Sequence, residues 1–104
     1  MISRHWKGIA KSGKADSYID HLKNDTFPKL REIDGFVNAS ILRRRVYEGT
    51  EFLIITVWES IDAIKAFAGE VAEMAVVPPV VQDMMLEYDR KAIHYEVTMD
   101  YTAQ

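Results

Sequence analysis

The pattern of apolar and polar positions predicts four β-strands. The clearest is 51–58, EFLIITVW, which is rich in the β-branched and aromatic residues that strands favour. The segment 36–47, FVNASILRRRVY, is predicted to be a second long strand, and Glu48-Gly49-Thr50 separates the two as a turn. So short a connection predicts an antiparallel hairpin. Weaker patterns at 2–10 and 92–99 predict a first and a last strand.

A helical pattern fills the interval between the first two predicted strands. Apolar residues recur every three or four positions through 15–33, as expected of a helix with one buried face. Pro28 predicts a kink or two abutting helices, because proline cannot donate the helical hydrogen bond. Gly35 is suited to a left-handed cap at the end of this segment. The recurring apolar residues are Tyr18, Ile19, Leu22, Phe27, Leu30 and Ile33.

A second helix is predicted after the hairpin. Ser60 is suited to cap the N-terminus of a helix over 61–68, because its hydroxyl can accept a hydrogen bond from a free backbone N–H group. Gly69 is expected to end that helix. Pro78-Pro79 then interrupts the chain, and 80–89 is expected to form a further short helix.

The predicted elements follow the order β-α-β-β-α-β over residues 1–104, which form a single predicted domain. This order is that of the ferredoxin-like α+β sandwich. Its two helical segments cover one face of an antiparallel sheet and leave the other face open.

Both faces of the strand at 51–58 are apolar, which is typical of a strand that is buried on both sides. A second copy of the chain, packed sheet to sheet, would cover the open face, so we expect a homodimer. The rival cover is the segment 80–89 folded back across the sheet. One face of the strand carries Phe52, Ile54 and Trp58, and the other carries Leu53, Ile55 and Val57.

Composition excludes several classes of function. The chain has no cysteine, which excludes disulfide scaffolds, thiol nucleophiles and cysteine-bound metals. The net charge of -3 disfavours nucleic-acid binding, and the run Arg43-Arg44-Arg45 is expected to be a solvated strand end. No apolar stretch approaches the ~18 residues of a membrane span, and the first residues, MISRHWKG, lack the apolar core of a signal peptide. We therefore expect a cytoplasmic protein that needs neither membrane nor nucleic acid.

Two tryptophans are candidates for the wall of a pocket. Trp58 ends the third predicted strand and is expected to be buried between the sheet and the second helix, either as a core residue or as a pocket wall. Trp6 shares a strand face with Arg4 and Gly8, because side chains alternate along a strand. These three residues could line the polar end of a pocket, or Arg4 could be a surface arginine lying over an aromatic ring.

The histidines offer little other chemistry. His94 and Glu96 share a strand face, so His94 is either a general base or part of an exposed structural pair. His21 and Asp25 lie four residues apart on the predicted helix, but one such pair is too small a ligand set for zinc. The sequence therefore predicts no metal site.

Three segments together resemble the antibiotic biosynthesis monooxygenase superfamily. They are IDGFVNASILRR, FLIITVWESIDAIKAFAGE and the closing HYEV, and the likeness extends over nearly the whole chain. The resemblance implies a dimeric α/β barrel of ferredoxin-like subunits. It also implies oxidation of aromatic polyketides or quinols by molecular oxygen without an added cofactor, or, in another branch, binding and degradation of heme.

The resemblance carries over to individual residues only in part. Trp58 matches a tryptophan that lines the pocket in both branches. Ile54 and Ile64 stand where the polyketide-oxidising branch has an asparagine and a tyrosine. Trp6 and Ala68 stand near the asparagine and the proximal histidine of the heme branch. Heme binding is therefore disfavoured.

The first functional hypothesis is a small oxygenase that acts on an aromatic or quinone-like molecule without cofactor. His94 is the predicted base and Arg4 the predicted stabiliser of an enolate or phenolate, while Trp6, Trp58 and Phe67 are the predicted substrate-binding walls. The alternative is a non-catalytic ligand-binding or stress-response protein of the same fold, which the isoleucines at 54 and 64 favour.

Overall fold

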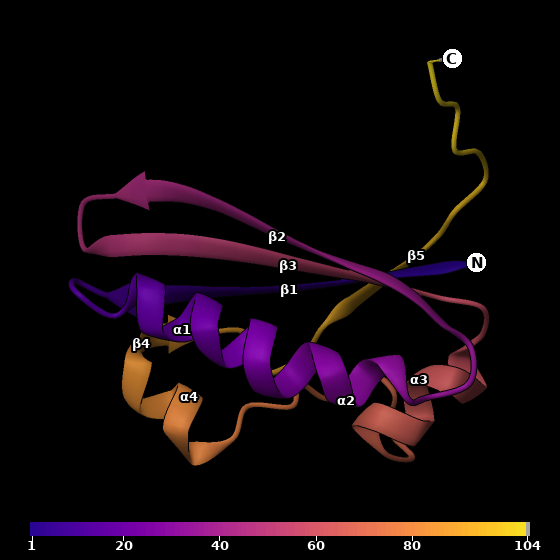
Figure 1. Cartoon of the computed structure of the whole chain (residues 1–104), viewed down its shortest axis with the longest axis horizontal. Coiled ribbons are helices and arrows are strands. Elements are labelled where there is room, and N and C mark those ends of the chain that lie inside the picture. Colours follow the sequence, from indigo (N-terminus) through magenta and orange to yellow (C-terminus); the bar gives the residue numbers. More distant parts are fainter. Residues whose placement is uncertain (104) are drawn as a thin grey trace.

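The computed structural model describes residues 1–103 and has the predicted ferredoxin-like α+β architecture (Figure 1). An antiparallel sheet forms one layer, and the helices lie together against one of its faces. The strands lie in the order β2-β3-β1-β4, and β5 pairs with the N-terminal half of β1. In chain order the elements are β1 (Ile2–Lys11), α1 (Ala15–His21), the π-helical turn η1 (Leu22–Thr26), α2 (Phe27–Arg31), β2 (Phe36–Val46), β3 (Gly49–Trp58), α3 (Ile61–Ala68), α4 (Pro79–Met84), β4 (Met85–Tyr88) and β5 (Ile93–Glu96).

The register of the sheet turns the even-numbered residues of β1 and β3 toward the helices. Arg4 pairs with Thr56, and Trp6 pairs with Ile54 on the neighbouring strand. Along β3 from Phe52 to Trp58, the even-numbered residues are buried and the intervening ones are only half-buried. The predicted alternation is therefore confirmed, and so is the shared face of Arg4, Trp6 and Gly8. The buried residues of β3 are Phe52, Ile54, Thr56 and Trp58.

The first helical segment is continuous in direction but contains a wide turn (Figure 1). α1 and α2 abut across η1, where the N–H of Phe27 bonds to the carbonyl of Leu22, five residues earlier. The prediction of two abutting helices is confirmed, but the junction precedes Pro28. Pro28 itself lies in the first turn of α2, where a missing N–H group removes little hydrogen bonding.

The second helix begins and ends where the sequence predicts. The hydroxyl of Ser60 accepts a hydrogen bond of 3.1 Å from the N–H of Ala63, and Gly69 ends α3 with a φ of +90°. α3 packs on one end of the sheet around Trp58, while α1 and α4 pack on the other end around Phe52. The core consequently has two clusters of buried residues, one at each end of the sheet.

The prediction of a helix over 80–89 is wrong for its second half. α4 ends at Met84, and β4 then pairs with β1 at Gly8, Ile9 and Ala10. This part of the edge of β1 is not occupied by β5, so its backbone groups are free to pair with a strand. Met85 enters the core beside Trp6, and the last strand is shorter than predicted, over Ile93–Glu96.

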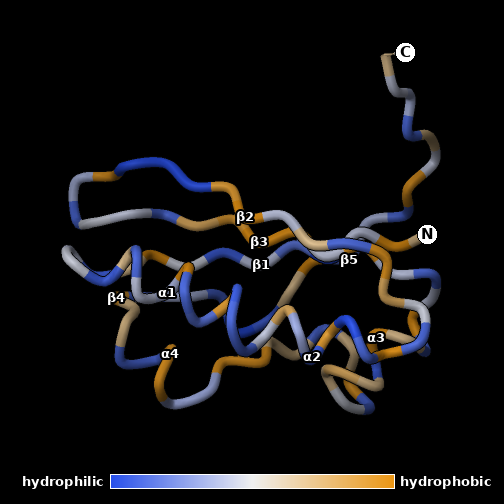
Figure 2. The backbone as a smooth tube through the Cα atoms, viewed as in Figure 1, coloured by the Kyte–Doolittle hydropathy of each residue, from blue (hydrophilic) through white to orange (hydrophobic). Residues whose placement is uncertain are grey.

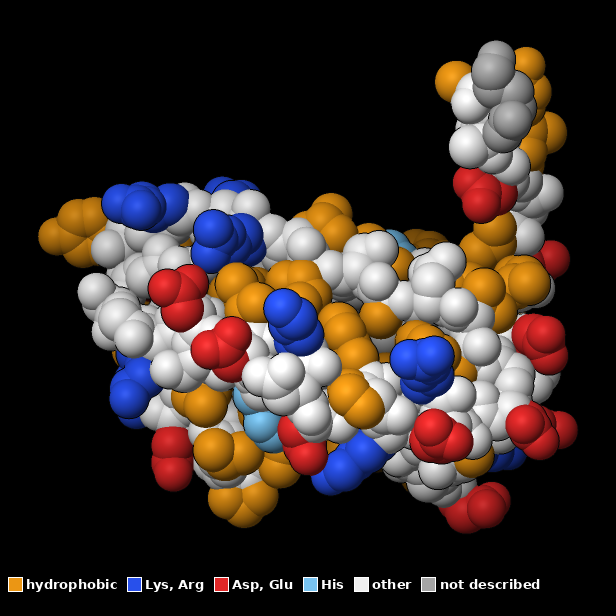
Figure 3. Space-filling model, in the orientation of Figure 1, with side chains coloured by type: hydrophobic (Ala, Val, Ile, Leu, Met, Phe, Trp, Pro, Cys, Tyr) orange, Lys and Arg blue, Asp and Glu red, His pale blue; other side chains and the backbone are white. Residues whose placement is uncertain are grey.

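The hairpin carries a polar tip and an apolar middle. Figure 2 shows β2 as apolar where it crosses the centre of the sheet and strongly polar along its arginine run. Arg43, Arg44 and Arg45 are exposed, which confirms the predicted solvated strand end, and Arg44 donates a 2.7 Å hydrogen bond to Glu51. After β5 the chain leads away from the body over 97–103 (Figures 1 and 3). No helix among residues 1–103 is long and apolar enough to span a bilayer.

Candidate functional site

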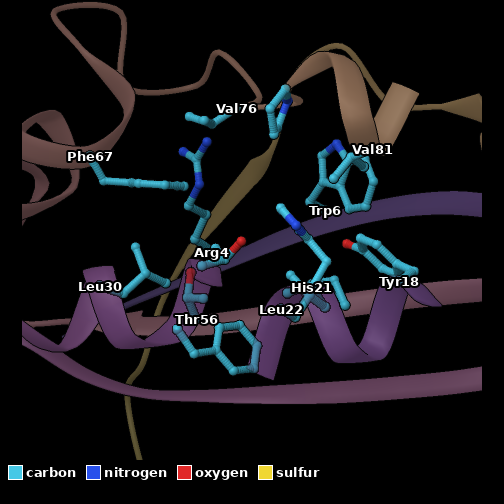
Figure 4. A pocket seen from close by; sticks show the side chains of 14 residues that line it. Arg4, Trp6, Tyr18, His21, Leu22, Leu30, Thr56, Phe67, Val76 and Val81 are labelled. Carbon is cyan, nitrogen blue, oxygen red and sulfur yellow. The ribbon is translucent and has the colours of Figure 1, made fainter. Parts of the chain in front are cut away.

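A cavity of about 70 Å³ lies between the sheet, the α1–η1–α2 segment and the chain that follows α3 (Figure 4). It separates the two clusters of the core, and its wall is mainly apolar. The polar side chains in the wall are drawn from distant parts of the sequence. The lining residues are Arg4, Trp6, Tyr18, His21, Leu22, Thr26, Phe27, Leu30, Ile54, Thr56, Phe67, Val76, Pro78 and Val81.

Arg4 is the charged group of this cavity, and its side chain is buried with 4% of its surface exposed. Its guanidinium donates to the carbonyl of Ala72, to that of Met74 at 2.8 Å and to Nε2 of His94 at 2.8 Å. Burial lowers the pKa of Arg4, and the nearby charge of Glu73 opposes that shift. An arginine retains its charge under such conditions, so the cavity has a fixed positive end.

His94 lies opposite Arg4 in the pairing of β1 with β5 and is half-buried. Burial lowers the pKa of His94, the positive charge of Arg4 lowers it further, and Glu73 acts in the opposite sense. A neutral imidazole is what the bond from Arg4 needs, because a protonated ring has no free lone pair. His94 thus lies behind Arg4, outside the cavity wall, and its role as a base stays a prediction.

Two of the three predicted aromatic walls line the cavity. Trp6 lies over Gly8, where a Cβ atom would come within 2.7 Å of Cη2 of the indole, so glycine leaves the room that the ring occupies. Nε1 of Trp6 donates to the carbonyl of Asp89 at 2.8 Å, which fixes the ring. Phe67 faces the guanidinium of Arg4, whose Cζ is 5.8 Å from the ring centroid.

Trp58 is fully buried, as predicted, and lies one layer behind the cavity. Its ring stacks on Phe67 with centroids 6.0 Å apart, and its Nε1 donates to Oγ1 of Thr56 at 2.9 Å. Both of these neighbours line the cavity. Trp58 therefore supports the wall, and direct contact with a substrate stays a prediction.

The helical wall contains polar groups that the sequence did not mark as functional. Tyr18 is buried, which raises the pKa of its hydroxyl above the ordinary value. His21 and Thr26 also line the cavity, from the end of α1 and from η1. The helical spacing identified Tyr18 as a core position but could not show that His21 faces the same space. For Thr56 the sequence offered a clearer indication of a polar position in the cavity wall, since it is a polar residue among the apolar, inward-facing residues of β3.

The part of the chain that the structure describes contains no cluster of three or more His, Asp or Glu side chains that could hold a metal ion. The functional groups that line the cavity are the buried guanidinium of Arg4, the imidazole of His21, hydroxyl groups and aromatic rings.

Solved structures share this fold over nearly their whole length. The monooxygenase ActVA-Orf6 of Streptomyces coelicolor, solved with nanaomycin D, superposes with a TM-score of 0.68 at 16% identity, covering 99% of this chain and 92% of that one. The heme degrader MhuD of Mycobacterium tuberculosis gives 0.62 at 18% identity, covering 98% and 100%. SnoaB of Streptomyces nogalater, a cofactor-independent oxygenase, gives 0.59 at 14% identity, covering 95% and 94%. At these identities the likeness establishes the fold.

The fold defines a ferredoxin-like α+β protein, with a mainly apolar cavity between the sheet and the helices. The sequence of residues 1–73 matches the antibiotic biosynthesis monooxygenase family, so the chain belongs to this family. No curated protein of described function matches the sequence.

Proposed function

We propose that this protein binds a small planar aromatic molecule in the cavity and promotes its oxidation by molecular oxygen without a cofactor. The observation that carries the proposal is the buried guanidinium of Arg4 at one end of an apolar cavity walled by Trp6 and Phe67. A cation in such surroundings stabilises an anion far better than it would in water.

In this reaction the substrate supplies the electrons. An activated CH₂ group becomes a carbonyl, one atom of O₂ enters the product and the other leaves as water, so that four electrons pass from carbon to oxygen. Loss of a proton from the substrate gives the enolate or phenolate that reacts with oxygen. Arg4 would stabilise this anion, while the aromatic walls hold the ring plane and exclude water.

His94 enters the proposal through Arg4. Its Nε2 accepts from the guanidinium, which holds Arg4 in the orientation that faces the cavity. A base role for His94 requires Nε2 to exchange this hydrogen bond for one with the substrate. The two roles are separable, because a positioning role survives replacement by another acceptor and a base role does not.

The size of the cavity limits what can enter it in the present arrangement. Its volume of about 70 Å³ is roughly half of a ~150 Å³ apolar cavity that accepts benzene. A fused ring system would need the segment 69–78 to shift, because Val76 and Pro78 form part of the wall. Arg4 holds the same segment through the carbonyls of Ala72 and Met74.

Oxygen consumption tests the activity. We expect purified protein without cofactor to accelerate oxygen uptake by members of a panel of anthrones and hydroquinones, and the His94→Ala variant to be slower. Electrode traces would be compared with the autoxidation of each compound alone. Rates equal to autoxidation across the panel would contradict the oxygenase proposal.

The second candidate is ligand binding without turnover. The observation that favours it is Ile54, which lines the cavity and cannot form a hydrogen bond where a polar side chain would be expected from the resemblance. Binding of panel compounds without oxygen uptake would establish this alternative.

We further propose that two copies pack through the open sheet face. That face carries half-buried Leu53, Ile55 and Val57 from β3. It also carries exposed Leu42 from the neighbouring β2 and exposed Tyr95 from β5, which pairs with β1. So many neighbouring apolar side chains favour a cover, and a second copy presents a matching face.

Sedimentation equilibrium at micromolar concentration measures the assembly. We expect a species of about 24 kDa, twice the 12.0 kDa of the chain. Ile55→Glu should shift it to the monomer, because a charge then lies in the middle of the open face. Val80→Glu, on exposed α4, is the matched control and should leave the dimer intact. A 12 kDa species for the unaltered protein would refute the dimer.

A further inference from the structure

One polar atom in the cavity wall has an unusual environment. Nε2 of His21 is buried and has no hydrogen-bond partner among residues 1–103. Buried polar atoms in native proteins are nearly always paired, and an unpaired one requires an explanation. The ring belongs to a side chain with 14% of its surface exposed, so bulk water does not account for it.

The π-turn explains why the helix does not satisfy this atom. In the ordinary course Asp25, four residues later, would pair with His21 along the helix surface. η1 begins directly after His21, and the carboxylate of Asp25 is 3.9 Å from Nε2, beyond hydrogen-bond distance. The same carboxylate instead binds Nζ of Lys29 at 3.0 Å. Thr26 lines the cavity beside His21, while Asp25 is half-exposed outside it. π-turns are frequent at functional sites.

The direction of the imidazole points to a ligand. In Figure 4 the ring of His21 rises from its helix into the cavity, between Arg4 on one side and Trp6 and Tyr18 on the other. A planar molecule lying between these groups would present its edge to Nε2. The aromatic and aliphatic lining satisfies the rest of such a ligand, so a polar substituent on that edge is the feature that His21 can recognise.

We infer that His21 is the residue that selects an aromatic ligand carrying a hydroxyl group, by a hydrogen bond between that hydroxyl and Nε2. A hydroxyl suits this position with either tautomer of the ring, because it can donate to a bare nitrogen or accept from an N–H group. The inference rests on the ligand-binding part of the proposed function and adds to it the group that the pocket recognises.

The selection comes from the hydrogen bond itself. A ligand with a hydroxyl pairs the buried nitrogen, whereas a ligand without one leaves it unpaired, as it already is in the free protein. Arg4 alone would attract any anion or carbonyl, and the aromatic walls would accept any flat ring. His21 would therefore add discrimination between a hydroxylated ring and the bare one to whatever preference Arg4 provides.

The test compares 2-naphthol with naphthalene by NMR titration of ¹⁵N-labelled protein. Both are fused rings and need the same shift of the segment 69–78, so its cost cancels in the ratio of their affinities. We expect the unaltered protein to bind 2-naphthol roughly tenfold more tightly. In His21→Leu the preference should fall severalfold, to what Arg4 alone provides, with naphthalene affinity kept or improved. In His21→Gln, whose amide lies close to the position of Nε2, much of the preference should return. The ratio of affinities within each variant is insensitive to a partial loss of folding.

His5 supplies the matched control. It lies on the other face of β1, where its Nε2 is 2.8 Å from Oγ of Ser3, so His5→Leu should keep the full preference for 2-naphthol. An unchanged preference in His21→Leu, or tighter binding of naphthalene by the unaltered protein, would overturn the inference and leave the proposed function standing. Binding of neither probe by the unaltered protein would overturn the ligand-binding proposal, and the inference with it.

Discussion

Replacing Trp58 by alanine is expected to lower the free energy of unfolding by about 3–5 kcal/mol. Trp58 is fully buried, packs edge-to-face on Phe36 with centroids 5.2 Å apart, and stacks on Phe67. Alanine would leave a large cavity between the sheet and α3, and it would remove the donor to Thr56. Urea denaturation followed by far-UV circular dichroism measures the change.

Two other variants make this result interpretable. Trp58→Phe keeps most of the ring and should lose roughly half as much, because it forfeits the hydrogen bond and part of the volume. Trp6→Ala removes a half-buried tryptophan from the cavity wall and should lose less than Trp58→Ala. A loss below about 1 kcal/mol for Trp58→Ala would show that the ring is not a core element.

The parts of the fold that the sequence predicted best depend on local signals. The alternation and β-branched composition of β3 fix its face and its pairing within the hairpin. The Ser60 cap and the Gly69 stop define α3 because each acts through its own backbone geometry. Such elements need no knowledge of their neighbours.

The elements that the sequence mispredicted depend on distant partners. The pattern of 80–89 suits a helix, but Met85–Tyr88 lies against the part of β1 that β5 leaves free, and pairing there overrides the local pattern. The π-turn at Leu22–Thr26 likewise could not be predicted from apolar residues that recur every three or four positions, because that spacing is the same with or without the turn.

In the candidate site, too, the residues set by local patterns were predicted and those set by distant packing were not. Strand parity was enough to place Arg4 and Trp6 on one face of β1, and Phe67 followed from the apolar face of α3, but parity alone did not show that this face of β1 meets the helices. From the sequence, His21 stood out only with Asp25, as a pair too small to form a zinc site. Its orientation into the cavity follows from the π-turn and from the packing of the helix on the sheet, neither of which a single sequence reveals.

Replacing Arg4 by alanine is expected to release the segment 69–78 from the sheet. The guanidinium is the link between β1 and the carbonyls of Ala72 and Met74, and its loss leaves both of them without their buried donor. We expect a loss of roughly 2–4 kcal/mol in the free energy of unfolding, because several bonds from a charged donor disappear together. Ligands that rely on the positive end of the cavity should also bind far more weakly.

Amide hydrogen exchange distinguishes local release from general destabilisation. The N–H of Ala75 bonds to the carbonyl of Arg90, so its exchange reports on the attachment of the segment, while the amides of β3 report on the core. In Arg4→Ala, exchange at Ala75 should accelerate much more than exchange in β3. Arg4→Lys should restore part of the protection, since an ammonium reaches one carbonyl but lacks the planar fork that holds both. Equal acceleration at Ala75 and in β3 would mean that Arg4 stabilises the whole fold and does not specifically hold the segment 69–78. Loss of the Arg4 contacts would then not be the step that lets a larger ligand enter the cavity.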